Sequence, residues 1–501
     1  MPGLVTDGYS AVFHYGVLLA SVFYTWLGLV FTFKILLGLG FRYRNALITC
    51  ILILLGSNLY FYGFLHPGTS HAYSFSMMAV FLYYLQQFFY RNRLSDLIFT
   101  SLALGLTVLI RPFNILAIFL VFFVADSYGS FTRKIRESLM CTKKLLIAVI
   151  PFLAVISIQV FINLLQSGQI FQWSYKNEGF YFDDPQLLNI WFSYRKGLFL
   201  YTPLILISLL GLIPLYKRSR YRAMTGLLFF LLISYFISSW WNWYYGDSFG
   251  MRPFIDYYPF FAILLAYLLR SLSGKFAKIT AILLFAALVS LNLFQTWQYQ
   301  NSILHHADMN REKYWFVFLK TGKEYQNILG DGPESIYREN ELEMLARYTH
   351  AFSRQKQNWQ VKETAFGRHE DQISDTLCVF NSKIDFGCTL SLKATNIPGS
   401  REAYFAECTF DLMEIDTNAS SSAFLVASVA SATGEKRSYK AFRIKAVPDK
   451  KTLQWEQKLF KFKLEGIKKP DDIVKIYLWN PEKKEFLIDD IQVIFYLITV
   501  S

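Results

Sequence analysis

Long apolar runs separated by short polar loops fill the first 300 residues of the chain. The pattern predicts ten membrane-inserted segments, at residues 10–38, 45–64, 72–90, 95–110, 112–127, 145–166, 198–216, 223–241, 254–270 and 276–296. Most of these runs reach the ~20 residues that a helix needs to cross a bilayer. The short fourth and fifth runs are divided by Arg111-Pro112, and proline disfavours helix at the preceding residue. We therefore expect a helical hairpin there, with Arg111 at its tip.

The pattern changes beyond residue 297. Residues 298–356 predict a helical linker, and its aromatic stretch 310–319 has the amphipathic character of a segment lying on a membrane surface. From residue 357 onward, short alternating runs separated by turn signals predict an antiparallel β-sandwich, jelly-roll-like in its last strand. The expected domains are a polytopic helical domain at 1–297, the linker at 298–356 and an all-β sandwich at 357–501.

Charge predicts how the helices are oriented. Residues 1–300 carry 22 Lys and Arg against 9 Asp and Glu, so the net charge of +13 resides there, while residues 301–501 carry 28 of each. Sixteen basic residues occupy alternate loops, and the opposite loops hold only five: Arg111, Lys176, Arg195, Lys196 and Arg252. Basic loops stay in the cytoplasm. We expect a multi-pass protein of the cytoplasmic membrane with an extracytoplasmic sandwich, and we do not expect a nucleic-acid partner.

The loop between the apolar runs 223–241 and 254–270 combines unusual residue types. Ser239–Pro253 holds three Trp and three Tyr or Phe rings close to Asp247 and Arg252, with two glycines at which the backbone can turn. Aromatic faces, a carboxylate and a guanidinium at a membrane surface suit the binding of a sugar and a phosphate. The alternative is an aromatic loop that only anchors the protein at the interface.

Several outer segments resemble bacterial membrane glycosyltransferases of the GT-C superfamily, in particular the dolichyl-phosphate-mannose-protein mannosyltransferase-like proteins. The matching pieces lie within residues 5–320 and are Asp7-Gly-Tyr-Ser, Gly68-Thr-Ser-His-Ala-Tyr-Ser-Phe75, Ile110-Arg-Pro-Phe-Asn114, Phe192-Ser-Tyr-Arg-Lys-Gly197, Tyr201-Thr-Pro203 and Ser239–Pro253. The resemblance implies a GT-C-like helical fold. It also implies transfer of a sugar from a polyprenyl-phosphate-linked donor to a glycan, lipid or protein acceptor.

The resemblance also implies which residues carry the reaction. GT-C enzymes place their principal acid in the first large outer loop, and this chain matches the family only after that point, so the first helix and loop are expected to be missing. Asp7 and Asp247 are then the candidate carboxylates for removing the acceptor proton. Since charge builds on the leaving phosphate, positive partners are required. The candidates are Arg111, Arg195, Lys196 and Arg252.

Each of these roles has a structural alternative. Arg195 and Lys196 could simply anchor to anionic lipid headgroups, and Arg111 could hold its hairpin against another loop. The expected substrate-binding residues are His66, His71, Tyr194, Trp241 and Tyr245. The two histidines, with Pro and Gly between them, could instead form a structural turn or ligate a metal. No metal site is predicted, although a divalent cation is compatible with the chemistry.

Two function classes remain open from the sequence. Ionisable residues gather at the outer ends of the apolar runs, which favours a transferase acting at the outer face. A non-catalytic envelope-assembly or lipid-linked-saccharide transport protein is the alternative, and a transporter would place charged or broken helices near mid-membrane. Cys378, Cys388 and Cys408 lie in the sandwich, but three cysteines do not make a disulfide framework.

Overall fold

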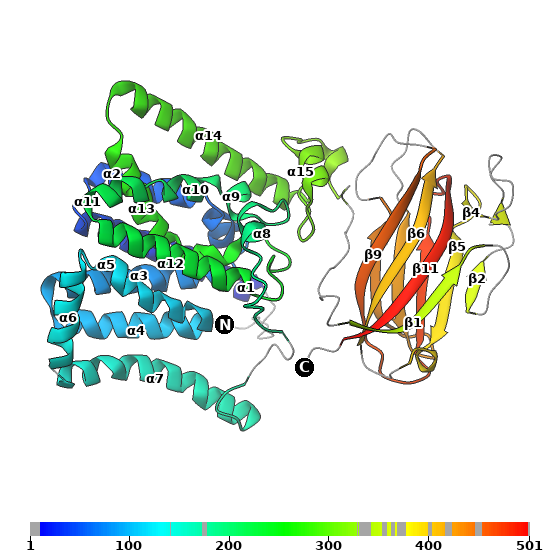
Figure 1. Ribbon diagram of the computed structural model, residues 1–501, viewed down its shortest axis with the longest axis horizontal. Coiled ribbons are helices and arrows are strands. Elements are labelled where there is room, and N and C mark those ends of the chain that lie inside the picture. The colour runs from blue at the N-terminus through cyan, green and yellow to red at the C-terminus, as the bar shows by residue number, and fades with distance from the viewer. Residues whose placement is uncertain are drawn as a thin grey trace. The chain divides into compact units, whose positions relative to one another are not determined.

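The computed structural model divides into two compact units, Met1–Asn301 and Ser302–Ser501 (Figure 1). It describes residues 11–140, 142–172, 178–327, 329, 342–352, 358–361, 366–367, 377–398, 403–415, 423–445 and 453–498. The first unit is helical and the second is built mainly of strands. The predicted order of a helical part followed by a β part is confirmed.

Helices and short helical turns make up the first unit. In chain order they are α1 (Ala11–Gly38), α2 (Tyr43–Leu55), η1 (Phe61–Leu65), α3 (His71–Arg91), α4 (Leu94–Ile110), η2 (Pro112–Phe119), α5 (Leu120–Val124), α6 (Tyr128–Met140), α7 (Thr142–Ser167), α8 (Leu187–Phe192), α9 (Leu198–Tyr201), α10 (Pro203–Leu209), α11 (Leu212–Arg218), α12 (Arg220–Ser238), η3 (Arg252–Tyr257), α13 (Tyr258–Ser271) and α14 (Lys275–Gln300). The predicted break at Arg111-Pro112 is confirmed, because α4 ends at Ile110 and Arg111 is extended.

The number of spans is smaller than the ten predicted. Among the described residues, five helices are long and apolar enough to cross a membrane: Ala11–Gly38, Leu146–Ser167, Arg220–Ser238, Arg252–Ser271 and Lys275–Gln300. A sixth is added if Pro112–Val124 and Tyr128–Glu137, which meet at a bend of 112°, count as one. The remaining apolar runs are broken into short pieces. The run 198–216, for instance, divides into α9, α10 and α11.

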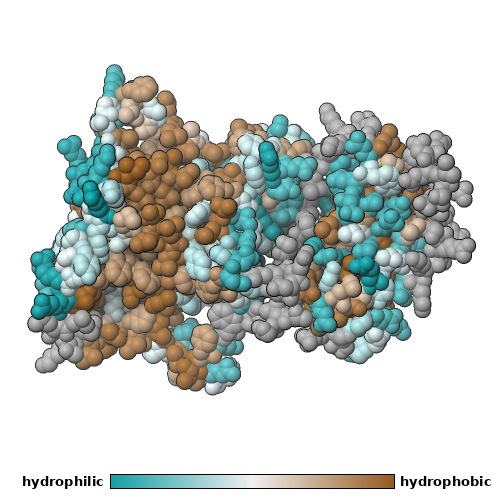
Figure 2. Space-filling model, in the orientation of Figure 1, coloured by the Kyte–Doolittle hydropathy of each residue, from teal (hydrophilic) through white to brown (hydrophobic). Residues whose placement is uncertain are grey.

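Burial separates the inner helices of the first unit from the outer ones. The segment Arg252–Ser271, which holds η3 and α13, is 78% buried, whereas the spans in α1, α7 and α14 are 22%, 17% and 11% buried. Apolar side chains therefore cover much of the outer surface of the helical unit, as the brown area over these elements shows (Figure 2). Such a surface suits surrounding lipid, and the helices fit a multi-pass membrane protein.

Two antiparallel sheets form the second unit (Figure 1). Its strands are β1 (Leu342–His350), β2 (Trp359–Val361), β3 (Phe366–Gly367), β4 (Leu377–Phe380), β5 (Phe386–Lys393), β6 (Ala403–Glu414), β7 (Phe424–Ala430), β8 (Lys436–Arg443), β9 (Trp455–Glu465), β10 (Ile473–Trp479) and β11 (Phe486–Ile498). The six-stranded sheet runs β3-β4-β11-β6-β9 with β1 paired to β11, and the five-stranded sheet runs β2-β5-β10-β7-β8.

The β part starts earlier than residue 357, where the sequence placed it. Strand β1 lies within the expected helical linker and pairs with β11 from Leu342 opposite Ile498 to His350 opposite Ile491. Its alternation is weak, since most of its residues are half-buried or exposed, so the strand was missed. The linker does contain a helix, α15 (Arg311–Val317), followed by the short turn η4 (Lys323–Tyr325). At the other boundary, α14 continues past residue 297 to Gln300.

One apolar core lies between the two sheets, built from inward-facing residues of both. Cys378, Cys388 and Cys408 belong to it as buried, free thiols. Their side chains contribute to the packing of this core.

Candidate functional site

A buried polar cluster joins three distant segments of the helical unit. Asp256 on η3 is 1% exposed, and its carboxylate accepts a hydrogen bond of 2.8 Å from the Asn114 amide. The Arg111 Nε lies 3.5 Å from that same oxygen, and the other carboxylate oxygen lies 2.9 Å from His71 Nδ1. Asp256 thus contacts His71, Arg111 and Asn114.

Local backbone structure brings these side chains together. His71 is the first residue of α3, Arg111 is the extended residue that ends α4, and Asn114 lies in the 3-10 turn η2 that Pro112 begins. Asn114 also donates to the Ser74 hydroxyl at 2.6 Å and accepts from the Tyr257 hydroxyl at 2.9 Å. The Arg111 guanidinium lies 2.8 Å from His71 Nδ1. Arg111 is therefore held in place by His71 and Asp256.

The aromatic loop 239–251 folds back through three residues with positive φ. Tyr245, Gly246 and Gly250 have φ of 58°, 60° and 63°, and glycine adopts such values without strain. The Tyr245 hydroxyl donates to the Ile237 carbonyl at 3.0 Å. Burial raises the pKa of Tyr245, and the nearby guanidinium groups of Arg111 and Arg252 act in the opposite direction. Both arginines thus lie within electrostatic range of this ring.

The end of this loop at Phe249 is held by hydrogen bonds to the segment before α3. Phe249 donates through its backbone N–H to the Tyr62 hydroxyl at 2.9 Å, and its carbonyl accepts from the Asn58 amide at 3.0 Å. The Asn58 amide oxygen also accepts from the Tyr258 hydroxyl. Residues next to Arg252 are therefore fixed by groups from α13 and from the segment between α2 and η1.

Lys196 reaches the same loop from the start of α9. Its side chain is 2% exposed, and its ammonium donates to the Ser248 carbonyl. The ammonium also lies 6.0 Å from the centre of the Tyr299 ring. Arg195 turns to the loop from the other side, since its guanidinium carbon lies 3.3 Å above the Tyr244 ring centre. Residues 195 and 196 thus both contact the aromatic loop.

Arg252 differs from the other cations beside the aromatic loop in its contacts. It is half-buried and begins η3, and none of the ion pairs found between described residues includes it. Its charge acts on the side chains of Tyr62, His71, Tyr245 and Tyr299. These four side chains therefore lie within electrostatic range of Arg252. The guanidinium is thus placed among polar groups without being neutralised by a carboxylate.

The other predicted residues have different surroundings. His66 is exposed and stacks on Phe61 at 5.5 Å, and both it and His71 pack against the Tyr62 ring, at 6.2 and 5.7 Å. Trp241 donates its backbone N–H to Gly179 at 3.0 Å, while its indole nitrogen is buried and lacks a partner among the described atoms. Tyr194 contributes its carbonyl, which accepts from the Tyr201 hydroxyl at 2.7 Å.

Of the two candidate carboxylates, the structure describes only Asp247. Asp247 is exposed on the loop. Asp7 lies outside the described residues. Within those residues, no group of three or more His, Cys, Asp or Glu side chains is arranged to hold a metal ion.

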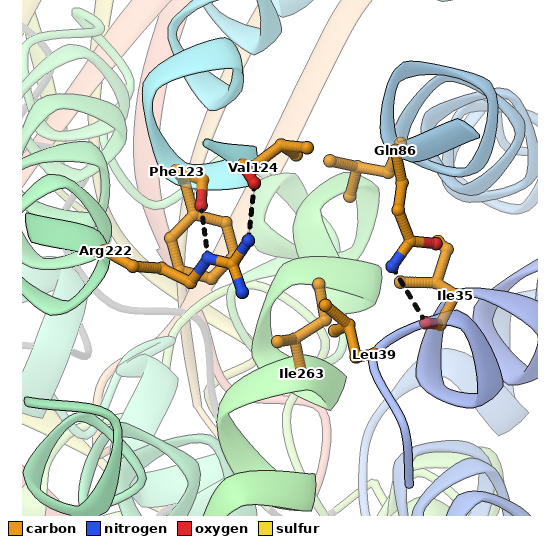
Figure 3. Close-up of a pocket in the computed structure, with 8 residues that line it drawn as sticks. Ile35, Leu39, Gln86, Phe123, Val124, Arg222 and Ile263 are labelled. Carbon is orange, nitrogen blue, oxygen red and sulfur yellow. Dashed lines mark hydrogen bonds between the residues drawn. The ribbon is translucent and has the colours of Figure 1, made fainter. Parts of the chain in front are cut away.

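A second buried arginine sits at a small cavity elsewhere in the helical unit (Figure 3). Arg222 donates to the carbonyl oxygens of Phe123 and Val124 and pairs with Asp126 at 2.7 Å. The cavity encloses about 10 Å³, which is room for about one water molecule. Gln86 across it donates to the Ile35 carbonyl at 3.2 Å. Arg222 thus ties α12 to the end of α5.

Comparison with known proteins gives only distant likenesses. No family model matches the chain, and no curated protein matches it. The structure is similar to the arabinosyltransferase EmbB from Mycobacterium smegmatis, with 11% identity and a TM-score of 0.31 over 96% of this chain and 57% of that one.

Two further likenesses cover less of the chain. One is to the CBM22-1 xylan-binding domain of Paenibacillus barcinonensis Xyn10C, with 15% identity and a TM-score of 0.21 over 31% of this chain and 95% of that one. The other is to the arabinose-bound arabinofuranosidase MgGH51, with 10% identity and a TM-score of 0.22 over 30% and 27%.

Proposed function

We propose that this chain is a membrane glycosyltransferase of the GT-C type. It transfers a sugar from a polyprenyl-phosphate-linked donor to an acceptor at the outer face of the cytoplasmic membrane. The observation that carries this proposal is the gathering of Arg111, Lys196 and Arg252 around one aromatic loop at the ends of apolar helices. Buried or half-buried cations are costly in such surroundings, which favours a functional reason for their presence.

Arg252 binds the donor phosphate in this proposal. A planar guanidinium offers paired N–H groups to phosphate oxygens. No carboxylate neutralises Arg252 within the described ion pairs, whereas Arg111 is compensated by Asp256 and Lys196 donates to a carbonyl. Arg111 and Lys196 then add positive potential around the phosphate without being its first contacts. Arg195, stacked on Tyr244, shapes the rim of the loop.

The sugar and the acceptor take the remaining places around the loop. Trp241, Tyr245 and Tyr194 supply ring faces and backbone groups beside the phosphate site. Asp247 accepts the acceptor's hydroxyl proton as the acceptor oxygen bonds to C1 of the sugar. The bond from C1 to the phosphate oxygen breaks, and the phosphate leaves with its negative charge near Arg252. Well-placed general bases contribute about 10²–10⁴-fold in rate.

The full chain reconstituted in liposomes tests this assignment. It is incubated with radiolabelled polyprenyl-phosphate hexoses and pentoses, and both donor binding and sugar transfer or release are measured. Arg252→Ala is expected to weaken donor binding about tenfold or more, the loss expected for hydrogen bonds to a charged group. Arg220→Ala is the matched control, because Arg220 is exposed and its guanidinium lies over the Tyr216 ring on α11.

Each outcome decides between the two function classes. Transfer that falls with Arg252→Ala and persists with Arg220→Ala supports the transferase. Donor binding by the unaltered chain with no transfer or release would overturn it and support transport of lipid-linked saccharides. Equal donor binding by both variants would show that Arg252 does not contact the donor.

The orientation of the chain belongs to the same proposal. An outer-face reaction requires Ser501 to lie outside the cytoplasm, as the excess of basic residues in alternate loops predicts. A reporter enzyme that works only in the cytoplasm, fused after Ser501, is expected to be silent. A reporter active only outside is expected to work, and the reverse result would invert the topology.

A further inference from the structure

The exposed face of the five-stranded sheet carries an unusual set of side chains. Register places Gln360, Thr389 and Tyr477 in a line across the strands, which continues to the buried Val426. The adjacent line holds Ser391, Lys475, Ser428 and Tyr439, and the next holds Lys393, Ile473, Ala430 and Lys436. Hydroxyl, amide, aromatic and ammonium groups thus alternate over a continuous surface.

Charge is segregated between the two sheets of the sandwich. The five strands of this sheet contain six basic residues and no acidic residue. The strands of the other sheet contain four basic and eight acidic residues. On that sheet the charges also pair with one another, as Lys461 does with Glu407 at 2.7 Å. In the five-stranded sheet Arg437 pairs with Asp472, and the positive charge of the outer face comes from Lys393, Lys436 and Lys475, so its complement is an anion.

Aromatic rings on the same face stay accessible. Phe386 is 43% exposed and Tyr439 is 46% exposed. The Phe386 ring lies 5.7 Å from Tyr477 at an angle of 61°, and it stacks on Trp479 at 6.5 Å. Exposed rings held by neighbouring rings lose little conformational freedom on binding. They offer flat apolar faces to the C–H side of a sugar ring.

The face is hollowed where these groups meet. The hollow has a volume of about 430 Å³ and is lined by residues of β2, β5, β7, β8 and β10, among them Thr389, Ser428, Lys436, Lys475 and Tyr477. This volume lies within the range of about 300–1,000 Å³ typical of ligand sites. Hydroxyl-bearing side chains, two ammonium groups and a ring converge in it. A flat lipid surface would not need a hollow with this polar lining.

We propose that this face binds an acidic polysaccharide, one whose sugars carry carboxylate or phosphate groups. Lys436 and Lys475 bind the anionic groups, Tyr477 and Phe386 stack on sugar rings, and Thr389 and Ser428 hydrogen-bond hydroxyl groups. The inference does not depend on the transferase reaction of the helical unit. A polysaccharide held there is either a product or a wall component to which the protein is anchored.

Binding is measured with the full-length chain in detergent and fluorescent oligogalacturonides as the probe. Uncharged oligosaccharides of the same length, single-stranded DNA and vesicles rich in phosphatidylglycerol are compared with it. Lys475→Ala and Tyr477→Ala are each expected to weaken oligogalacturonide binding about tenfold, the effect of losing a hydrogen bond to a charged group or a stacked ring. Binding should weaken as salt rises, because screening reduces the attraction between charges.

Two variants on the other sheet serve as controls. Lys461→Ala removes a similar charge and Tyr496→Ala a similar ring from the six-stranded sheet, and both should bind as the unaltered chain does. Lys475 is exposed, so its variant keeps the fold, and unchanged circular dichroism checks this.

The outcomes separate the ligand classes. Equal binding of charged and uncharged oligosaccharides would overturn the acidic specificity. Tighter binding of DNA or vesicles than of oligogalacturonides, lost in the same variants, would overturn the polysaccharide assignment. Loss of binding in the control variants as well would show that the ligand does not bind at this face. Sugar transfer that fails while oligogalacturonide binding persists would bear on the transferase alone.

Discussion

Removing the Asp256 carboxylate should destabilise the helical unit strongly. In Asp256→Ala, the Asn114 amide and His71 lose an acceptor at 2.8 and 2.9 Å, and the Arg111 guanidinium loses its counter-charge at 3.5 Å. Breaking a buried ion pair by removing one partner costs about 3–5 kcal/mol. Since ~1 kcal/mol shifts the midpoint of a large domain by about 2 °C, we expect the melting temperature to fall by about 6–10 °C.

The assay is thermal unfolding of the purified chain in detergent, followed by tryptophan fluorescence. Asp247→Ala is the control, because Asp247 is exposed and a surface substitution changes stability by about 0.5 kcal/mol or less. The double variant Arg111→Met with Asp256→Leu should recover part of the loss, because apolar residues in place of a buried pair leave no unpaired charge. A midpoint within about 1 °C of the unaltered chain for Asp256→Ala would refute this reasoning.

Three further predictions concern other parts of the molecule. Burial by itself raises the pKa of Asp472, but backbone N–H groups and Arg437 hold that pKa below its ordinary value of 3.8. The contribution of Asp472 to stability is therefore complete above that pH and is lost as the pH falls below it. Asp472→Asn should flatten the acid side of the sandwich's pH–stability profile, and an unchanged profile would contradict the pairing. Gly211→Ala should lower stability by about 1–3 kcal/mol, because its Cβ would lie 1.9 Å from the Leu264 carbonyl oxygen, and an unchanged melting temperature would contradict that close contact. Burial raises the pKa of the Cys388 thiol, so a maleimide should label it only after denaturation, and labelling of the native chain would show that the core opens.

The sequence predicted the membrane unit and the sandwich because both rest on strong periodicities. It overestimated the spans because hydropathy does not register helix breaks inside an apolar run, such as those that divide 198–216. Strand β1 was missed for the opposite reason. Its burial pattern is irregular, and only its pairing with β11 makes it a strand.

Within the candidate site, the loop and its cations were predictable and the cluster beneath them was not. The Gly246 and Gly250 turns and Arg252 stand out in the sequence as rare residue types between apolar runs. Asn114 and Asp256 were not assigned to the site, because contacts between residues 142 positions apart follow from tertiary packing. A lone Asp inside an apolar run was the one available signal.

The Asp256 cluster also sets an order on the synthesis of the protein. Asn114 and His71 precede Asp256 by 142 and 185 residues. At about 5–20 residues per second, the ribosome needs on the order of ten seconds to reach Asp256 after Asn114 has emerged. During that interval Arg111 has no carboxylate from η3 beside it. The helices α3 and α4 are therefore complete before the segment that contacts them has been synthesised. The pace of translation through residues 112–256 thus sets how long the nascent membrane unit stays incomplete.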